Sequence, residues 1–322
     1  MFFATYFILK KIKRWNKYTL LYLGVSLTLY LATLIFGTSI GGSKNWITIS
    51  GFGFQPSEII KILFVFFIAS YYSNIEKYKK KFKAKTSLIF MAISYSYMGF
   101  LFLQKEVGTA VLLFLVFNVL FYVYEENRKL ISLNFIGAIV MSVVGYLVFN
   151  HVRIRVDIWL NPWKDVAGRG YQIAQSLFAI GEGGLFGTGI GLGYPDFIPE
   201  VHTDFIFSAI CEEMGLFAGI GVIMLFMIMV YRGVKIALEQ HNIFYRILSL
   251  GITATIGFQA FIILGGVISM IPLTGITLPF ISYGGSSLIS GFISLAILQV
   301  ASEELDIEEE ELENESRIQK NN

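Results

Sequence analysis

The dominant pattern along the chain is a series of long apolar runs separated by short polar segments. Each run holds about 20 mainly apolar residues, the length that an α-helix needs to cross a bilayer. The eight runs are roughly residues 18–38, 56–73, 86–103, 107–124, 131–150, 205–231, 247–271 and 284–302. They are continuous and lack the alternation of a membrane β-barrel. Because backbone polar groups in lipid must be satisfied within each segment, the pattern predicts an all-α, polytopic transmembrane helical bundle with about eight spans.

Composition agrees with a membrane protein. Hydrophobic residues make up 55% of the 322 residues and charged residues 15%, whereas a soluble domain carries about 25% charged residues. The mean hydropathy is +0.65. The net charge of +2 gives no case for nucleic-acid binding. One cysteine cannot form an internal disulfide, and three histidines argue against a Cys/His metal cluster.

The distribution of basic residues predicts the orientation. Sixteen Lys and Arg residues lie on one side of the spans, in residues 10–17, 77–85, 128–129 and 232–246, and six lie on the other. The excess predicts that the first side is cytoplasmic. Residues 151–204 then form one long extracytoplasmic loop, and the C-terminus is cytoplasmic.

Three parts follow along the chain. Residues 1–17 form an N-terminal stub and a basic cytoplasmic segment, in which the first nine residues are too short to span and are either an interfacial stub or the remnant of a helix. Residues 18–302 form the transmembrane domain. Residues 303–322 are strongly acidic, which predicts a disordered cytoplasmic tail, with a docking tail for a basic partner as the alternative.

Charged residues near the outer ends of the spans are candidates for function, because charge inside a membrane is costly. Glu58 and Lys61 are three residues apart and share a helix face. They form either a neutralised ion pair that holds helices together or a polar site. Glu106 lies in a tight outer turn, which must be polar in any case.

The long loop carries two arginines, Arg153 and Arg155. Their guanidinium groups could hold an anionic group such as a phosphate, or could reach to the membrane interface without a ligand. The glycine-dense stretch 181–193 lacks the signature of a phosphate-binding loop.

At the end of the loop, Asp204, Ser208 and Glu212 recur every four residues, which predicts one polar stripe that enters the membrane. A carboxylate in a partly desolvated cleft can serve as a general base, while helix capping and buried hydrogen bonding are the alternative. Two prolines and three glycines in residues 272–287 predict broken, re-entrant backbone at the outer face.

Together these residues resemble the SEDS family (FtsW/RodA/SpoVE) of bacterial cell-wall synthesis over about residues 20–302. Five stretches match in the family's order: FQPSEIIK (54–61), LQKEVGTA (103–110), GYQIAQSLFAIGEGGLFGTGIG (170–191), PEVHTDFIFSAICEEMG (199–215) and IPLTGITLPFISYGGSS (271–287).

The resemblance implies a peptidoglycan glycosyltransferase that polymerises lipid II, a disaccharide-pentapeptide on undecaprenyl diphosphate, in division, elongation or sporulation. The family's essential aspartate falls on Asp204 in the HTDF motif, and its conserved Glu and Lys fall on Glu58 and Lys61. The leaving diphosphate requires Arg, Lys or a divalent cation (Mg²⁺ or Mn²⁺), for which Arg153 and Arg155 are candidates. The expected substrate-binding set also includes Glu106, His202 and Glu212. The expected partner is a class B penicillin-binding protein, a transpeptidase.

Two departures accompany the resemblance. The family usually has ten spans and this sequence predicts eight, as a misplaced start codon, a fragment or a genuine short form would give. The family's aspartate in the DLGT motif is Glu106 here. A lipid II transporter is an alternative function, although a transporter should place essential charges near the midplane. A non-catalytic scaffold for a penicillin-binding protein is the other alternative.

Overall fold

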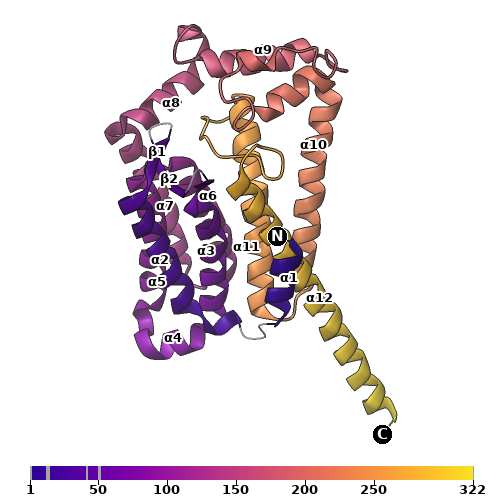
Figure 1. Ribbon diagram of the computed structural model, residues 1–322. Helices are drawn as coiled ribbons and strands as arrows, with labels where there is room; N and C mark the ends of the chain where they lie inside the picture. The colour runs from indigo at the N-terminus through magenta and orange to yellow at the C-terminus, as the bar shows by residue number, and fades with distance from the viewer. Residues whose placement is uncertain (1, 12–14, 41–42, 50–51, 322) are drawn as a thin grey trace. The chain divides into compact units, whose positions relative to one another are not determined.

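Helices dominate the computed structural model (Figure 1), which describes residues 2–11, 15–40, 43–49 and 52–321. The α-helices are α1 (Phe2–Lys11), α2 (Thr19–Phe36), α3 (Pro56–Ser73), α4 (Ile75–Phe82), α5 (Thr86–Leu103), α6 (Val107–Tyr124), α7 (Arg128–Val148), α8 (Asn150–Leu160), α9 (Tyr171–Gly183), α10 (Ile206–Glu239), α11 (Ile243–Val267) and α12 (Gly285–Asn321). Within the described residues, eight helices are long and apolar enough to cross a membrane: α2, α3, α5, α6, α7, α10, α11 and residues Gly285–Glu304 of α12. The eight predicted spans and the helical bundle are therefore confirmed.

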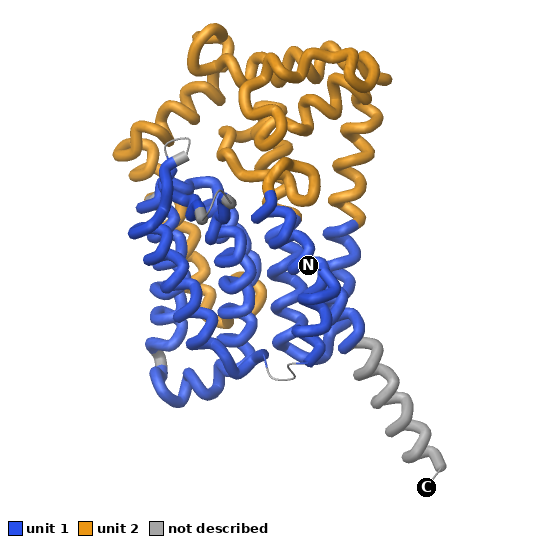
Figure 2. The backbone as a smooth tube through the Cα atoms, in the orientation of Figure 1, with its two compact units in different colours: residues 1–120, 229–256, 285–322 blue, residues 121–228, 257–284 orange. Residues whose placement is uncertain are grey.

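The chain divides into two compact units (Figure 2). Unit 1 holds residues 1–120, 229–256 and 285–322, and unit 2 holds residues 121–228 and 257–284. In unit 1, α3 is the most buried helix, with Phe64, Val65 and Ile68 fully buried. Close approach of α11 to α3 depends on Gly251, where a Cβ would meet the side chain of Val65.

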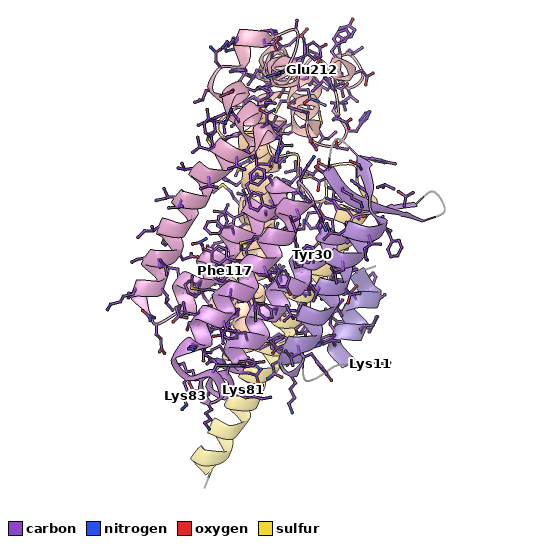
Figure 3. The ribbon with its side chains drawn as sticks, turned by 90° about the vertical axis from the view of Figure 1, so that its left-hand side faces the viewer. Lys11, Tyr30, Lys81, Lys83, Phe117 and Glu212 are labelled. Carbon is purple, nitrogen blue, oxygen red and sulfur yellow. The ribbon has the colours of Figure 1, made fainter. Side chains whose placement is uncertain are left out.

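Basic residues of unit 1 gather at one end of its helices. Figure 3 shows Lys11, Lys81 and Lys83 at the same end, away from Tyr30 and Phe117 farther along the helices. Lys11 belongs to the predicted basic segment 10–17, and Lys81 and Lys83 belong to the segment 77–85, so the structure places these two segments on one side of unit 1. Tyr30 and Phe117 are buried inside it.

A small antiparallel sheet between α2 and α3 is an addition to the predicted all-α fold. Its strands are β1 (Thr38–Ile40), β2 (Ser43–Ile49) and β3 (Phe52–Phe54), in the order β1-β2-β3. Thr38 pairs with Trp46, and Ile47 pairs with Phe54. Strands this short between two long apolar runs give a weak pattern, which explains why the sequence did not predict them.

Residues 151–204 are not one irregular loop. They contain most of α8, all of α9 and two short 3₁₀ turns at Pro162–Asp165 and Pro195–Phe197. Helix α9 buries one face through Ile173, Ala174 and Ser176, which is the spacing of a helix on a surface. By contrast, residues 268–284 form no helix, as the prolines and glycines of this segment predict.

Both ends of the chain are helical in the described residues. Helix α1 lies along α12, where the Tyr6 hydroxyl donates to the Glu303 carboxylate at 2.7 Å and Lys10 pairs with it at 2.8 Å. Helix α12 continues through the acidic segment to Asn321. Glu, Gln, Lys and Arg are good helix formers, so a preceding helix can extend through them.

Candidate functional site

Asp204 lies in a turn immediately before α10, in unit 2. Its amide N–H donates to the carbonyl oxygen of Glu200 at 3.1 Å. The turn is joined to a distant segment by two hydrogen bonds: Tyr283 N–H donates to the His202 carbonyl at 2.8 Å, and the Ser282 hydroxyl donates to the Thr203 carbonyl at 2.6 Å. The HTDF motif and the ISYGG motif are therefore hydrogen-bonded to each other, although some 80 residues separate them.

Arg155, on α8, is the cation of this site. Its Nη1 donates to the carbonyl oxygen of Thr274 at 2.8 Å. The next residue, Gly275, has a φ of +72°, and a Cβ there would lie 3.4 Å from Asp204 Oδ2 and 3.7 Å from Arg155 Nη2. The backbone at Gly275 thus lies against both charged groups.

Burial controls the ionisation of this pair. Desolvation raises the pKa of Asp204 to about 6, and the negative charge of Glu200 adds to this, while Arg155 and a hydrogen bond from Thr203 oppose it. Burial also lowers the pKa of Arg155, and the charge of Asp204 opposes that change. A carboxyl group with a pKa just below neutrality is suited to general-base chemistry at neutral pH.

The two arginines of the sequence prediction separate in the structure. Arg153 is exposed; its Nη2 donates to the carbonyl of Leu147 at 2.9 Å and its guanidinium lies over the ring of Tyr146 at 5.7 Å. The His202 side chain is also exposed, and it is the backbone carbonyl of this residue that joins the site. The structure therefore brings Arg155, and not Arg153, to Asp204.

The predicted polar stripe from Asp204 through Ser208 to Glu212 is present only in part, because Ser208 and Glu212 lie on the first segment of α10 and Asp204 does not. Asp204 precedes the helix, and α10 is interrupted at Gly215, where φ is 81° and ψ is 175°. Glu212 is buried, and its Oε1 accepts a hydrogen bond from the amide of Tyr194 at 2.7 Å. Glu212 lies on the short helical segment of α10 that precedes Gly215. Its carboxylate is hydrogen-bonded to the end of the glycine-dense segment.

A second polar cluster lies in unit 1. Lys61 Nζ is 2.9 Å from Glu58 Oε1, and both side chains are buried. The Ser290 hydroxyl donates to Glu58 Oε2 at 2.5 Å. The predicted shared face and ion pair are thus present, with a serine of α12 as a third member that the sequence did not indicate.

Three side chains of unit 1 donate hydrogen bonds to the carboxylate of Glu106. Its Oε1 accepts hydrogen bonds from Gln55 Nε2 at 2.9 Å, from the Ser57 hydroxyl at 2.7 Å and from the Thr109 hydroxyl at 2.7 Å. Burial raises the pKa of Glu106, and the bonds from Ser57 and Thr109 oppose the rise. This carboxylate therefore joins the beginnings of α3 and α6.

Sequence reasoning missed Ser282, Thr274, Gly275 and Ser290 as parts of these clusters. For Thr274, Gly275 and Ser282 the signal was the Pro- and Gly-containing stretch 271–287, but small residues in a membrane protein equally indicate close helix packing. Ser290 lies beyond that stretch.

The sequence also predicts that a divalent cation could take part in the reaction. Across the described residues, no group of three or more His, Cys, Asp or Glu side chains could hold a metal ion. Beside Asp204, Glu200 is the other carboxylate whose charge acts on the site. These residues do not make a complete protein-only metal site. Mg²⁺ commonly needs only one or two carboxylates when substrate phosphates supply the other ligands.

Comparisons with known proteins place this geometry in context. Residues 1–307 match the model of the FtsW/RodA/SpoVE family, described as a cell cycle protein. The chain is 37% identical over 267 residues to peptidoglycan glycosyltransferase RodA of Mycobacterium tuberculosis, covering 80% of this chain and 57% of that protein. It is 34% identical over 294 residues to stage V sporulation protein E of Bacillus subtilis, covering 88% of this chain and 78% of that protein. The chain thus spans less than two thirds of the length of the mycobacterial relative.

Solved structures share the fold. One is a chain of a peptidoglycan synthase complex that coordinates polymerization and crosslinking, with a TM-score of 0.77 and 25% identity over 94% of this chain and 87% of that one. Another is the Rod shape determining protein RodA of Thermus thermophilus, with a TM-score of 0.65 and 24% identity over 94% of this chain and 83% of that one.

Proposed function

Since this chain belongs to the FtsW/RodA/SpoVE family, we propose that it is a peptidoglycan glycosyltransferase that polymerises lipid II into glycan strands. Relatives that carry this activity in their names support the proposal. The observation that carries it is the desolvated carboxyl group of Asp204, whose pKa is raised to about 6 beside the guanidinium of Arg155.

The two charged groups have complementary roles in this reaction. The Asp204 carboxylate accepts the proton of the acceptor sugar hydroxyl, and the resulting oxygen attacks the anomeric carbon of the growing chain. The bond from that carbon to the diphosphate oxygen breaks, and undecaprenyl diphosphate leaves with the electron pair. Arg155, which keeps further N–H donors beyond the bond to Thr274, attracts the developing charge of the leaving group.

We place the buried pair Glu58 and Lys61, together with Glu106, in the binding of the lipid-linked substrate. Their support is the cost of charge in a membrane segment, which makes a buried ion pair on α3 a candidate functional site. The excess of basic residues on one side supports an extracytoplasmic location for Asp204 and a cytoplasmic C-terminus.

A class B penicillin-binding protein is the partner that we propose. The support is the solved complex of similar fold that couples polymerization with crosslinking. Mg²⁺ or Mn²⁺, delivered with the substrate diphosphate, is the proposed cation, and the chemistry above does not depend on it.

The test is polymerisation of fluorescent lipid II by the purified chain in liposomes, with and without its transpeptidase partner and with Mg²⁺ or Mn²⁺. Asp204→Asn is compared with Asp157→Asn, the same chemical change at an exposed carboxylate on α8. We expect glycan strands from the wild type and from Asp157→Asn, and none from folded Asp204→Asn. A folded wild type that stays inert with partner and cation contradicts the proposal. Translocation of lipid II that survives Asp204→Asn would instead favour a transporter.

A further inference from the structure

A run of unit 2 without charged residues exposes large apolar side chains to its surroundings. Residues 184–194, which we call the apolar loop, lie between α9 and α10 (Figure 1). No charged residue occurs between Glu182 and Asp196. The exposed fractions of Phe186, Ile190 and Leu192 are 81%, 80% and 71%. Exposed apolar patches of this kind mark sites of contact with protein or membrane.

Six amides of the apolar loop donate hydrogen bonds inside the protein. Two glutamate side chains accept from these amides: Glu213 Oε1 from the amide of Gly191 at 3.1 Å, and Glu212 Oε1 from the amide of Tyr194 at 2.7 Å. Backbone carbonyls accept the amides of Gly187 (2.7 Å), Thr188 (2.9 Å), Gly189 (3.0 Å) and Leu192 (3.0 Å). The hydroxyl of Thr188, the one polar side chain of the loop besides the Tyr194 phenol, donates to the Glu212 carbonyl at 3.1 Å. These internal bonds lower the cost of moving this irregular backbone out of water, since a polar group buried without a partner is costly.

The apolar loop lies beside the start of the long apolar part of α10. The amides of Leu216 and Phe217 donate to the carbonyls of Gly184 and Leu185 at 2.9 and 3.3 Å. The rings of Phe186 and Phe217 are 5.5 Å apart. From Phe217 onward α10 exposes one apolar side chain after another: Phe217, Ile220, Met224, Leu225, Met227 and Ile228. The exposed surface of the loop is therefore continuous with the lipid-facing surface of a spanning helix.

We propose that the apolar loop inserts into the membrane leaflet at this end of α10. Lipid is the occupant that the observations favour, because the loop has no charge, six of its amides donate hydrogen bonds inside the protein, and its surface continues that of a membrane span. Glu182 and Asp196, which bound the uncharged run, then lie at headgroup level. This inference does not depend on the proposed glycosyltransferase activity.

The test uses single cysteines labelled with an environment-sensitive fluorophore in the full chain, reconstituted in phosphatidylcholine–phosphatidylglycerol liposomes. The one native cysteine, Cys211, is buried, so labelling is selective. Ile190→Cys and Leu192→Cys report on the loop, Leu225→Cys on α10 is the lipid-facing control, and Lys164→Cys is the exposed polar control in the same unit. Each label is quenched in turn by acyl-brominated lipid and by aqueous iodide.

We expect labels at 190 and 192 to be quenched by brominated lipid several-fold more than the label at 164, and to be protected from iodide as at 225. Glu213→Ala, which removes the acceptor for Gly191, should reduce this difference for the label at 190, whereas Glu213→Gln keeps an acceptor oxygen and should preserve it. Quenching by iodide at 190 and 192 as strong as at 164 would show that the loop lies in water. Protection from both quenchers would show that protein covers it. Either result overturns the proposal.

Discussion

The ionisation of Asp204 makes a quantitative prediction for the pH dependence of polymerisation. Its pKa of about 6, against an ordinary value of 3.8, corresponds to about 3 kcal/mol of disfavoured charge. A carboxyl group with this pKa is about 90% ionised at pH 7 and about 10% ionised at pH 5. If Asp204 is the general base, kcat/KM should therefore fall about tenfold between pH 7 and pH 5. A carboxyl group with its ordinary pKa would lose less than about a tenth of its ionised form over the same range.

Substitution of Arg155 tests whether Asp204 is the group that titrates in the pH profile. The charge of Arg155 opposes the rise in the pKa of Asp204, so Arg155→Gln should move the acid limb to higher pH, while Arg155→Lys should keep it near the wild-type position. The assay is the initial rate of lipid II polymerisation from pH 5 to pH 8 at constant ionic strength. A rate at pH 5 within twofold of the rate at pH 7, or an acid limb that stays in place in Arg155→Gln, would refute the reasoning.

The same shift has a consequence for stability, with a defined sign. Because the folded-state pKa of Asp204 lies above its ordinary value, the carboxyl group favours the folded state below about pH 4. This contribution is lost as the pH rises from 3.8 to about 6. Asp204→Asn should therefore raise the thermal stability at pH 7 and change it little at pH 4. An equal gain at both pH values would contradict the assigned pKa.

Three further predictions concern the Glu58–Lys61 pair, the apolar loop and the Asp204 site. Glu58→Gln removes the negative charge 2.9 Å from the buried Lys61 ammonium and should lower the free energy of unfolding by about 3–5 kcal/mol, with partial recovery when Lys61→Met is added. Thermal unfolding that does not change in the single variant would contradict a stabilising buried pair. Gly187→Ala forces a φ of +82° on alanine and places a Cβ 2.2 Å from a backbone oxygen, so it should destabilise the chain by more than about 1 kcal/mol. Gly221→Ala, which meets open space, should be neutral, and equal melting temperatures for the two glycine variants would refute the close approach. Ser282→Ala removes the hydroxyl that joins the two motifs of the proposed active site. It should reduce kcat/KM by a factor that corresponds to about 1–3 kcal/mol of lost transition-state stabilisation, with full activity as the contrary result.

Local sequence patterns were sufficient for the membrane bundle. Each span is a run of apolar residues long enough to cross a bilayer by itself, and a pair such as Glu58 and Lys61 shares a face because both lie on one helix. The broken backbone at residues 268–284 likewise follows from its own prolines and glycines. In all these cases the determining contacts lie within a few residues of one another along the chain.

Features that depend on contacts between distant segments needed the tertiary structure. Arg153 and Arg155 have the same chemistry, but two residues apart on a helix they point about 200° apart, and only the position of α8 beside Thr274 and Asp204 selects Arg155. Asp204 lies in the turn before α10, so it does not share a helix face with Ser208 and Glu212 as the spacing predicts. The raised pKa of Asp204 has the same origin, because the desolvation and opposing charges that set it come from segments joined only when the chain folds.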